Sequence, residues 1–199
     1  MPKNQTLDEF YSTFREEVLC ASDTETSGWT TEDFLTNVMM EYLEEAGEVT
    51  DPVICPFRGY GLQMNAYAIS EDCESVDIFV SIYSESDRPR SVSQADIDAA
   101  IKRAIQLYHK AINDLYTAFQ KDNDTYEFAI TLHQNKDNIK HVRICALTNG
   151  LVKPIALKNI TIGDAEISFS LWDVDRLYRC VTSGKMRETI EIDFEEKFQ

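Results

Sequence analysis

The stretch of residues 59–85, GYGLQMNAYAISEDCESVDIFVSIYSE, constrains the fold more than any other part of the sequence. Residues 61–70 space β-forming side chains with polar ones, and residues 76–83 alternate strictly. A period of two is the pattern of a strand, so we predict two strands joined by a polar turn at residues 71–74, with one face on a core. The apolar phase of the second strand is Val76, Ile78, Val80 and Ile82, and its mixed phase is Asp77, Phe79, Ser81 and Tyr83.

Four segments have the three-to-four-residue spacing of apolar side chains that predicts an amphipathic helix. Three of them begin with a capping signal, a Thr or Ser followed three residues later by Glu or Asp. The strongest carries one apolar stripe over about six turns, which is long enough to cover a sheet. The predicted helices cover residues 7–20, 30–47, 93–119 and 173–182.

Strands are also predicted at residues 139–147, 159–163, 166–171 and 189–194. Residues 126–132 fit either a strand or a helix, and residues 51–60 are predicted as a loop because Pro52 and Pro56 interrupt them. This order of elements predicts an α/β (α+β) fold. It has a central mixed sheet flanked by helices on both faces, with a long crossover helix after the central hairpin. At 199 residues the chain is long enough for one domain with its own core.

Composition narrows the function classes. Five cysteines, Cys20, Cys55, Cys73, Cys145 and Cys180, show no CxxC pair and no metal-ligand spacing, which indicates reduced thiols in a cytoplasmic protein. No apolar run is long enough to cross a bilayer, so we expect no membrane partner. The net charge of -16 argues against broad nucleic-acid binding, although it leaves room for a local basic groove. It also fits a solubilising surface or an interface with a basic partner.

The sequence has no GxGxxG, GxxxxGK[ST], HExxH or GxSxG motif, so its candidate chemistry rests on acids. Asp77 lies among apolar residues on the second strand. Metal-dependent nucleases place a carboxylate in such a position, but an ordinary half-exposed strand can carry an acid there too. Glu41 and Glu45 lie at the edge of the second helix's apolar face, where each either reaches a site between helix and sheet or is solvated. The margin of the long helix forms either a modest basic edge or a solvated face. Its residues are Lys102, Arg103, His109 and Lys110.

Four segments together resemble one protein family: GYGLQMNAYAISEDCESVDIFVSIYSE, VRICALTNG, SFSLWDVDRLYR and TIEIDF. They are similar to the N-terminal domain of the AIPR family, the abortive-infection phage-resistance proteins found near restriction-modification operons. The likeness covers residues 7–194. It implies a restriction-endonuclease-like fold, in which a helix with a Glu precedes a strand pair, a helix crosses over and another strand follows. Because AIPR proteins are longer than this chain, we expect residues 1–199 to be one domain of a longer protein.

Active members of that fold place an Asp on the first strand of the pair, and an acid or Gln, any residue and a Lys on the second. The acids hold Mg²⁺, and the Lys assists the attacking water or the scissile phosphate. The resemblance puts the Asp position at Asn65, the second-strand acid at Val80 and the Lys at Ile82. The implied catalytic set is therefore degenerate. Asp77 lies on the second strand but out of register with that pattern.

The helix acid of the pattern matches Glu41, with Glu44 and Glu45 as alternatives.

Three hypotheses about function follow. The first is a nuclease-like module of a phage-defence protein that has a degenerate site and a binding or regulatory role. It predicts that Glu41, Asn65 and Asp77 converge at one end of the central hairpin. The second is an active Mg²⁺-dependent nuclease that uses Glu41 and Asp77, with Asp77 as the metal ligand and a lysine of the long helix. The third is a protein-interaction domain. Expected partners are the C-terminal region of the same protein, another defence protein or a second copy of the chain.

Overall fold

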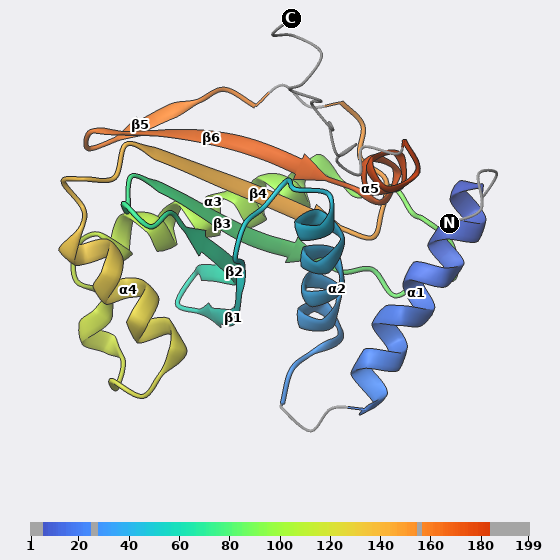
Figure 1. Ribbon diagram of the computed structural model, residues 1–199, viewed down its shortest axis with the longest axis horizontal. Coiled ribbons are helices and arrows are strands. Elements are labelled where there is room, and N and C mark those ends of the chain that lie inside the picture. The colour runs from blue at the N-terminus through green and yellow to red at the C-terminus, as the bar shows by residue number, and fades with distance from the viewer. Residues whose placement is uncertain (1–5, 25–27, 155–156, 184–199) are drawn as a thin grey trace, which may run out of the picture.

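The alternating stretch in the middle of the sequence forms the hairpin of β2 (Leu62–Ile69) and β3 (Ser75–Ile82), as predicted. The structure is a computed structural model that describes residues 6–24, 28–154 and 157–183. In this part of the chain, six strands form one sheet (Figure 1). The sheet is mixed, because β1 to β3 run antiparallel whereas β3, β4 and β6 run parallel. Its order is β1 (Val53–Gly59), β2, β3, β4 (His141–Thr148), β6 (Ala165–Trp172) and β5 (Ile160–Ile162).

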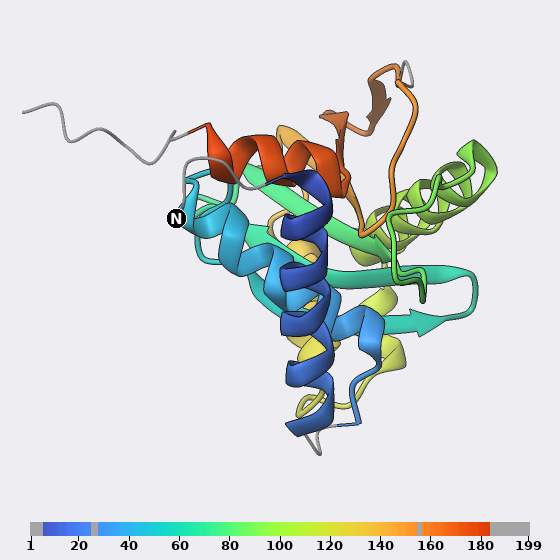
Figure 2. The same ribbon diagram turned by 90° about the vertical axis from the view of Figure 1, so that its right-hand side faces the viewer.

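Helices cover both faces of the sheet (Figure 2). One face carries α1 (Leu7–Thr24), α2 (Thr31–Glu45) and α5 (Val174–Thr182). The other carries α3 (Gln94–Ala111), the 3₁₀ turn η1 (Leu115–Ala118) and α4 (Asp124–Gln134). Because α3 lies on the path from β3 to its parallel neighbour β4, it is the predicted crossover helix. The predicted α/β (α+β) class, with a mixed sheet between two helical layers, is confirmed.

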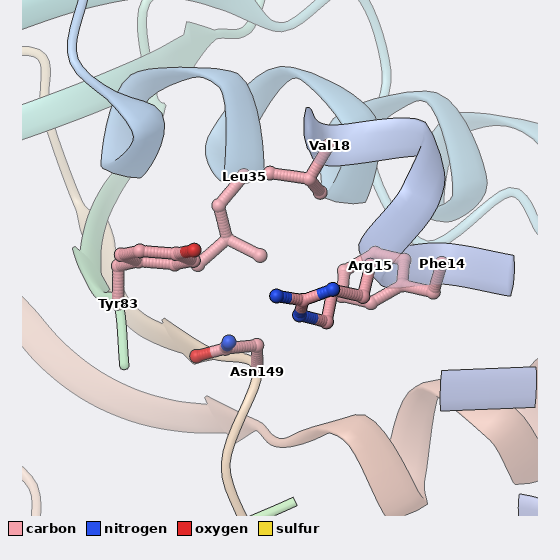
Figure 3. A pocket seen from close by; sticks show the side chains of 6 residues that line it. All are labelled: Phe14, Arg15, Val18, Leu35, Tyr83 and Asn149. Carbon is pink, nitrogen blue, oxygen red and sulfur yellow. The ribbon is translucent and has the colours of Figure 1, made fainter. Parts of the chain in front are cut away.

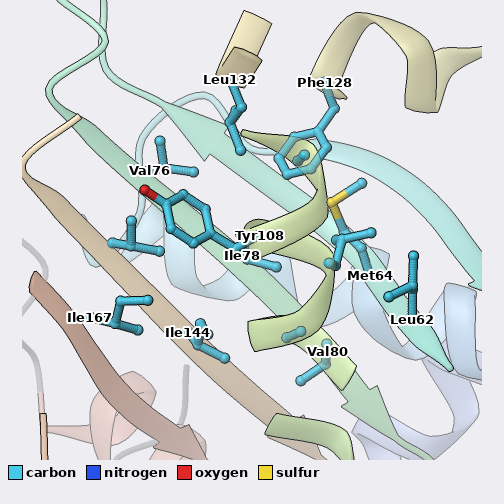
Figure 4. Close-up of a cluster of buried hydrophobic side chains, with 14 of the residues drawn as sticks. Leu62, Met64, Val76, Ile78, Val80, Tyr108, Phe128, Leu132, Ile144 and Ile167 are labelled. Carbon is cyan, nitrogen blue, oxygen red and sulfur yellow. The ribbon is translucent and has the colours of Figure 1, made fainter. Parts of the chain in front are cut away.

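The two phases of β3 are buried on opposite faces, as the alternation predicts. Val76, Ile78 and Val80 pack under α3 and α4 in an apolar cluster (Figure 4). Phe79 lies in the second cluster, with α1, α2 and α5. Burying one large apolar side chain contributes about 1.5–3 kcal/mol before conformational entropy is counted. Because Ser81 shares the phase of Phe79, it faces α2.

Three predictions about elements need correction or completion. Residues 51–60, predicted as a loop, contain β1, and Pro56 lies where the β1–β2 register shifts. Because β1 is an edge strand, the missing N–H of proline is tolerated there. The long apolar stripe is not one helix, since α3 ends at Ala111 and η1 follows. The undecided residues 126–132 belong to α4.

The other predicted elements in the described part of the chain are confirmed. The first helix runs on to Thr24, and the short helix begins at Val174 with Asp173 as its cap. The strands predicted at residues 139–147, 159–163 and 166–171 are β4, β5 and β6. The strand predicted at residues 189–194 lies outside the described residues. Among the helices described, none is long and apolar enough to cross a membrane.

Candidate functional site

β2 and β3 part at one end, and side chains bridge the gap between them. Their paired register ends at Ala66 and Phe79. Beyond that pair, the backbone N–H of Ser81 donates to Oδ1 of Asn65 (2.9 Å), and the Ser81 carbonyl accepts from Nε2 of Gln63 (3.1 Å). Gln63 and Asn65 are 0% and 3% exposed. Because buried backbone groups need hydrogen-bond partners, these two amides complete the ladder where the strands separate.

Hydrogen-bond chemistry fixes the orientation of the Asn65 amide. The N–H of Ser81 can only donate, so the Asn65 atom that faces it is the carbonyl oxygen. The amide nitrogen therefore faces α2, where it donates to Oδ1 of Asp33 (3.1 Å) and lies 3.5 Å from Oε1 of Glu32. We call Glu32, Asp33, Gln63, Asn65 and Ser81 the amide–acid cluster.

The two acids of the cluster come from the first turn of α2. Asp33 forms the predicted capping box, in which its Oδ2 accepts from the N–H and the hydroxyl of Thr30, both at 2.8 Å. Since the cap uses one carboxylate oxygen, Oδ1 is left to accept from Asn65. The N-terminal end of a helix carries partial positive charge, which stabilises carboxylates placed there.

Glu32 is the more accessible of the two acids. Its Oε1 accepts from Nη2 of Arg58 (2.8 Å) and from Nε2 of Gln63 (3.3 Å), and its Oε2 accepts from the backbone N–H of Tyr83 (3.4 Å). Burial raises the pKa of the Glu32 carboxyl above its ordinary value, and the Arg58 guanidinium opposes that rise. The charge of Glu32 therefore depends on keeping these donors in place.

Gln63 connects the cluster to the opposite face of the sheet. Arg103 of α3 has only donors, so its Nε donates to Oε1 of Gln63 (2.9 Å). The Gln63 nitrogen then faces Oδ1 of Asn65 (3.2 Å) as well as Ser81 and Glu32. Because α3 and α2 pack on opposite faces, one buried side chain links the two helical layers.

A pocket of about 360 Å³ opens beside the cluster. Its lining includes four cluster residues, together with the apolar side chains of Trp29, Phe57 and Met64 and the charged side chains of Arg58 and Asp124. Trp29 is 37% exposed, and its ring lies 5.5 Å from that of Phe34. A volume of several hundred Å³ with few convergent polar groups is typical of a binding site.

The structure brings only part of the predicted site together. Asn65 lies in the cluster, but Glu41 is exposed and accepts a hydrogen bond from Asn37 (2.9 Å). Glu41 is nine residues along α2 from Glu32, which corresponds to about 14 Å. Because the first turn of α2 and not its last half lies over the strand gap, the helix acids in contact with Asn65 are Glu32 and Asp33. Glu44 and Glu45 are also exposed.

Asp77 is separate from the cluster as well. Its carboxylate forms an ion pair with Arg143 of β4, with Nε donating to Oδ1 at 3.0 Å. Arg143 also donates to the backbone carbonyl of Glu48 (3.2 Å), which fastens β3 and β4 to the turn after α2. Asp77 lies four residues from Ser81 along β3, about 13 Å. The predicted convergence of Asn65, Asp77 and Glu41 is therefore wrong.

The second-strand positions of the resemblance face away from the cluster. Val80 is buried under α3, and Ile82 packs against the same apolar cluster. Ser81, between them, faces α2 and shares a 2.6 Å hydroxyl contact with Thr36. Lys102 of α3 is exposed, and its neighbour Arg103 contacts Gln63 of the amide–acid cluster.

Residues 35–179 match the family model of the abortive infection phage resistance protein N-terminal domain. The chain belongs to this family. Membership gives it a role in abortive infection, a defence against phage. Comparisons with curated proteins and with solved structures found no match. The matched range of this AIPR domain includes Gln63, Asn65 and Arg103 and begins two residues after Asp33.

A second, much smaller cavity of this AIPR domain lies at the end of β4 (Figure 3). Its volume is about 10 Å³, room for roughly one water molecule. Arg15, Tyr83 and Asn149 contribute its polar groups, and Arg15 donates from Nε to the carbonyl of Ser86 (2.9 Å). Because this space is so small and its donors already hold the backbone, we assign it a structural role.

The donor set of the amide–acid cluster does not fit a Mg²⁺ ion. Mg²⁺ requires oxygen ligands in near-octahedral geometry. All four carboxylate oxygens of Glu32 and Asp33 already accept hydrogen bonds, and the amide nitrogen of Asn65 faces them. Throughout the described ranges, no three His, Cys, Asp or Glu side chains group as metal ligands. We therefore assign no metal-dependent step to the cluster.

Proposed function

We propose that this AIPR domain is a nuclease-like module with a degenerate active site, which serves phage defence by binding. The site of binding is the amide–acid cluster with the pocket beside it, in which Glu32 and Asp33 take the place that the sequence analysis gave to Glu41 and Asp77. The proposed partner is the C-terminal region of the same protein or another defence protein.

The order of elements supports the nuclease-like part of the proposal. α2 precedes the strand pair β2 and β3, α3 crosses over, and β4 returns parallel to β3. This is the order that the resemblance to the restriction-endonuclease-like fold implies. A shared fold alone does not carry a function, so the site must carry the rest.

The orientation of Asn65 is the observation that carries the proposal. It lies on the first strand of the pair, beside the acids of the preceding helix, where an active relative has an Asp. Its nitrogen donates to Asp33, so the Asn65 atom that points toward the acids is a hydrogen-bond donor and not an oxygen that could bind a metal. Ser81 and Gln63 fill the remaining hydrogen bonds of the amide. The arrangement suits a partner that presents donors or cations to Glu32, without a metal.

The test is to restore the carboxylate. Asn65→Asp places three carboxylates together, and we expect it to bind Mg²⁺ or Mn²⁺ with a Kd below about 1 mM, whereas the wild type shows no titratable site. Isothermal titration measures binding, and cleavage of single- and double-stranded DNA and RNA is assayed on the same samples. Asn149→Asp is the matched control, because it makes the same change at a buried amide with no acid within hydrogen-bond reach.

Two outcomes count against the proposal. Wild-type cleavage in Mg²⁺ or Mn²⁺ that is lost in Glu32→Gln would replace it with an active nuclease, the second candidate. That candidate is favoured by one observation, the two carboxylates of Glu32 and Asp33 beside an open pocket. Equal metal binding by Asn65→Asp and Asn149→Asp would show that the amide–acid cluster is not a former metal site. The domain would then be a general interaction domain.

A further inference from the structure

Tyr60 occupies a backbone position that its side chain does not favour. The loop between β1 and β2 has two residues, Tyr60 and Gly61, with φ of +54° and +77°. Positive φ at both positions is the type I′ hairpin turn, in which Asn and Gly are preferred. A bulky side chain in this left-handed region is a conformational outlier, and such outliers persist where something compensates for them.

The compensation does not come from within the described part of the molecule. Tyr60 is 95% exposed, so its ring gains almost no burial. Figure 2 shows the hairpin that carries it reaching out below α3. An aromatic ring held in a disfavoured conformation at an exposed hairpin turn is available for contact with another molecule.

A groove of about 380 Å³ starts at Tyr60 and runs along α3. Leu62, Ile105 and Ile162 give it an apolar lining. The described lining contains one lysine, Lys110, and one histidine, His109, and no carboxylate. Lys102 lies two turns back on the same helix and is exposed, as is Asp98 one turn further back. The nearest acid in sequence is Asp164, two residues after Ile162.

This groove contrasts with the chain as a whole, which carries 35 acidic and 19 basic residues. An acidic overall charge repels an acidic ligand, so such a ligand favours a surface that carries a lysine and is not lined by carboxylates. The charge of the groove therefore favours an acidic ligand, and its apolar lining favours a ligand with apolar side chains.

We propose that the groove binds an acidic peptide segment of a partner protein, with an apolar side chain of that segment against Tyr60 and Ile105 and its carboxylates near Lys110 and His109. This site is separate from the amide–acid cluster, and the proposal does not depend on the function proposed for the cluster.

The experiment selects peptides from a random 12-residue library displayed on mRNA, with the whole chain as bait. We expect enriched sequences to combine Asp or Glu with large apolar residues. Tyr60→Asn and Lys110→Glu should each weaken their binding by about tenfold or more, as measured by fluorescence anisotropy. Arg179→Glu, which makes the same charge reversal on α5 across the sheet, should leave binding unchanged.

Tyr60→Asn separates binding from folding. Because Asn fits the turn better than Tyr, this variant should be at least as stable as the wild type while it binds less. Failure to enrich any peptide, enrichment of sequences without acids, or binding as tight as the wild type by either variant would overturn the proposal.

Discussion

On the β2 side of the end of β3, the Asn65 amide holds Ser81, and on the β4 side the Asn149 amide holds Ser84. Asn149 accepts from the Ser84 N–H at 2.9 Å and donates to its carbonyl at 2.8 Å. Both amides are buried, and both complete backbone pairing where a strand leaves its neighbour. The end of β3 is thus fastened on two sides by the same chemical device.

What lies beyond each amide differs. Beyond Asn149 are the hydroxyl of Tyr11, whose pKa is raised by burial, and a space for about one water molecule. Beyond Asn65 are two carboxylates and a pocket of about 360 Å³. A buried amide at a strand end is therefore no sign of a binding site by itself. The acids and the open space beside Asn65 make the difference.

The largest effect is expected on the Asn149 side of β3, where the space is small. An added Cβ at Gly150 would lie 2.5 Å from Cγ2 of Val92 and 2.6 Å from the carbonyl oxygen of Arg90. Since a backbone atom cannot move aside cheaply, Gly150→Ala should lower the free energy of unfolding by about 3 kcal/mol or more in urea denaturation. Gly59→Ala, where the nearest atom would be 3.7 Å away, is the control. Similar losses in both variants would contradict the close approach at Gly150.

Removing either amide should cost about 2 kcal/mol, because each deletion leaves buried polar groups unpaired. Only Asn65 also faces a carboxylate whose pKa it lowers, that of Glu32, so the loss in Asn65→Ala should be larger at pH 7 than at pH 3. The loss in Asn149→Ala should be the same at both. Urea denaturation at the two pH values measures this. Parallel behaviour of the two variants would mean that the acids beside Asn65 do not distinguish the two sides.

Asp77→Ala tests a residue that lies outside the regions around both Asn65 and Asn149. It removes the partly buried ion pair with Arg143, and we expect a loss of about 1–2 kcal/mol in the free energy of unfolding. Partner binding at the amide–acid cluster should be unaffected, since Asp77 does not contact it. Asp77→Asn, which keeps an acceptor for Arg143, should lose less. A binding defect in a stably folded Asp77→Ala protein would show that Asp77 contributes to the binding site.

The smallest effect is expected for Glu32→Gln, and it depends on pH. Because burial raises the folded-state pKa of Glu32, the folded protein binds this proton more tightly than the unfolded chain. Stability owed to this group therefore rises as pH falls through the window between the folded pKa and the unfolded value of about 4.3. Above the window, the variant avoids the cost of burying the charge and should be slightly more stable than the wild type. Below it, the two should be equal in thermal denaturation. A gain that persists at pH 3 would show that charge burial is not its cause.

Much of the fold follows from local pattern. The alternation of residues 76–83 predicts both the strand and the face of each side chain, because a strand has a strict period of two. The proline at position 56 misled the prediction of residues 51–60, because a single sequence does not show which strand will lie at a sheet edge. Apolar spacing likewise did not separate α3 from η1, since the stripe continues across the break between them.

The site was harder to predict. Asn65 was found through the resemblance, and the cap at Asp33 through its spacing, but neither reveals that the two side chains meet. Gln63 contacts Arg103 across 40 positions and Glu32 across 31, so no local motif contains them. Glu41 was chosen because the edge of a helix face is visible in sequence. Which end of the helix lies over the strand gap is decided by packing.

The two edges of the sheet are both poor templates for another strand. β1 contains Pro56 and a register shift, and β5 has only three residues. A proline lacks the N–H that a further strand would bond, and a short or irregular edge offers too few consecutive groups to recruit one. In the described part of the chain, the sheet therefore has little tendency to pair edge to edge with a second copy.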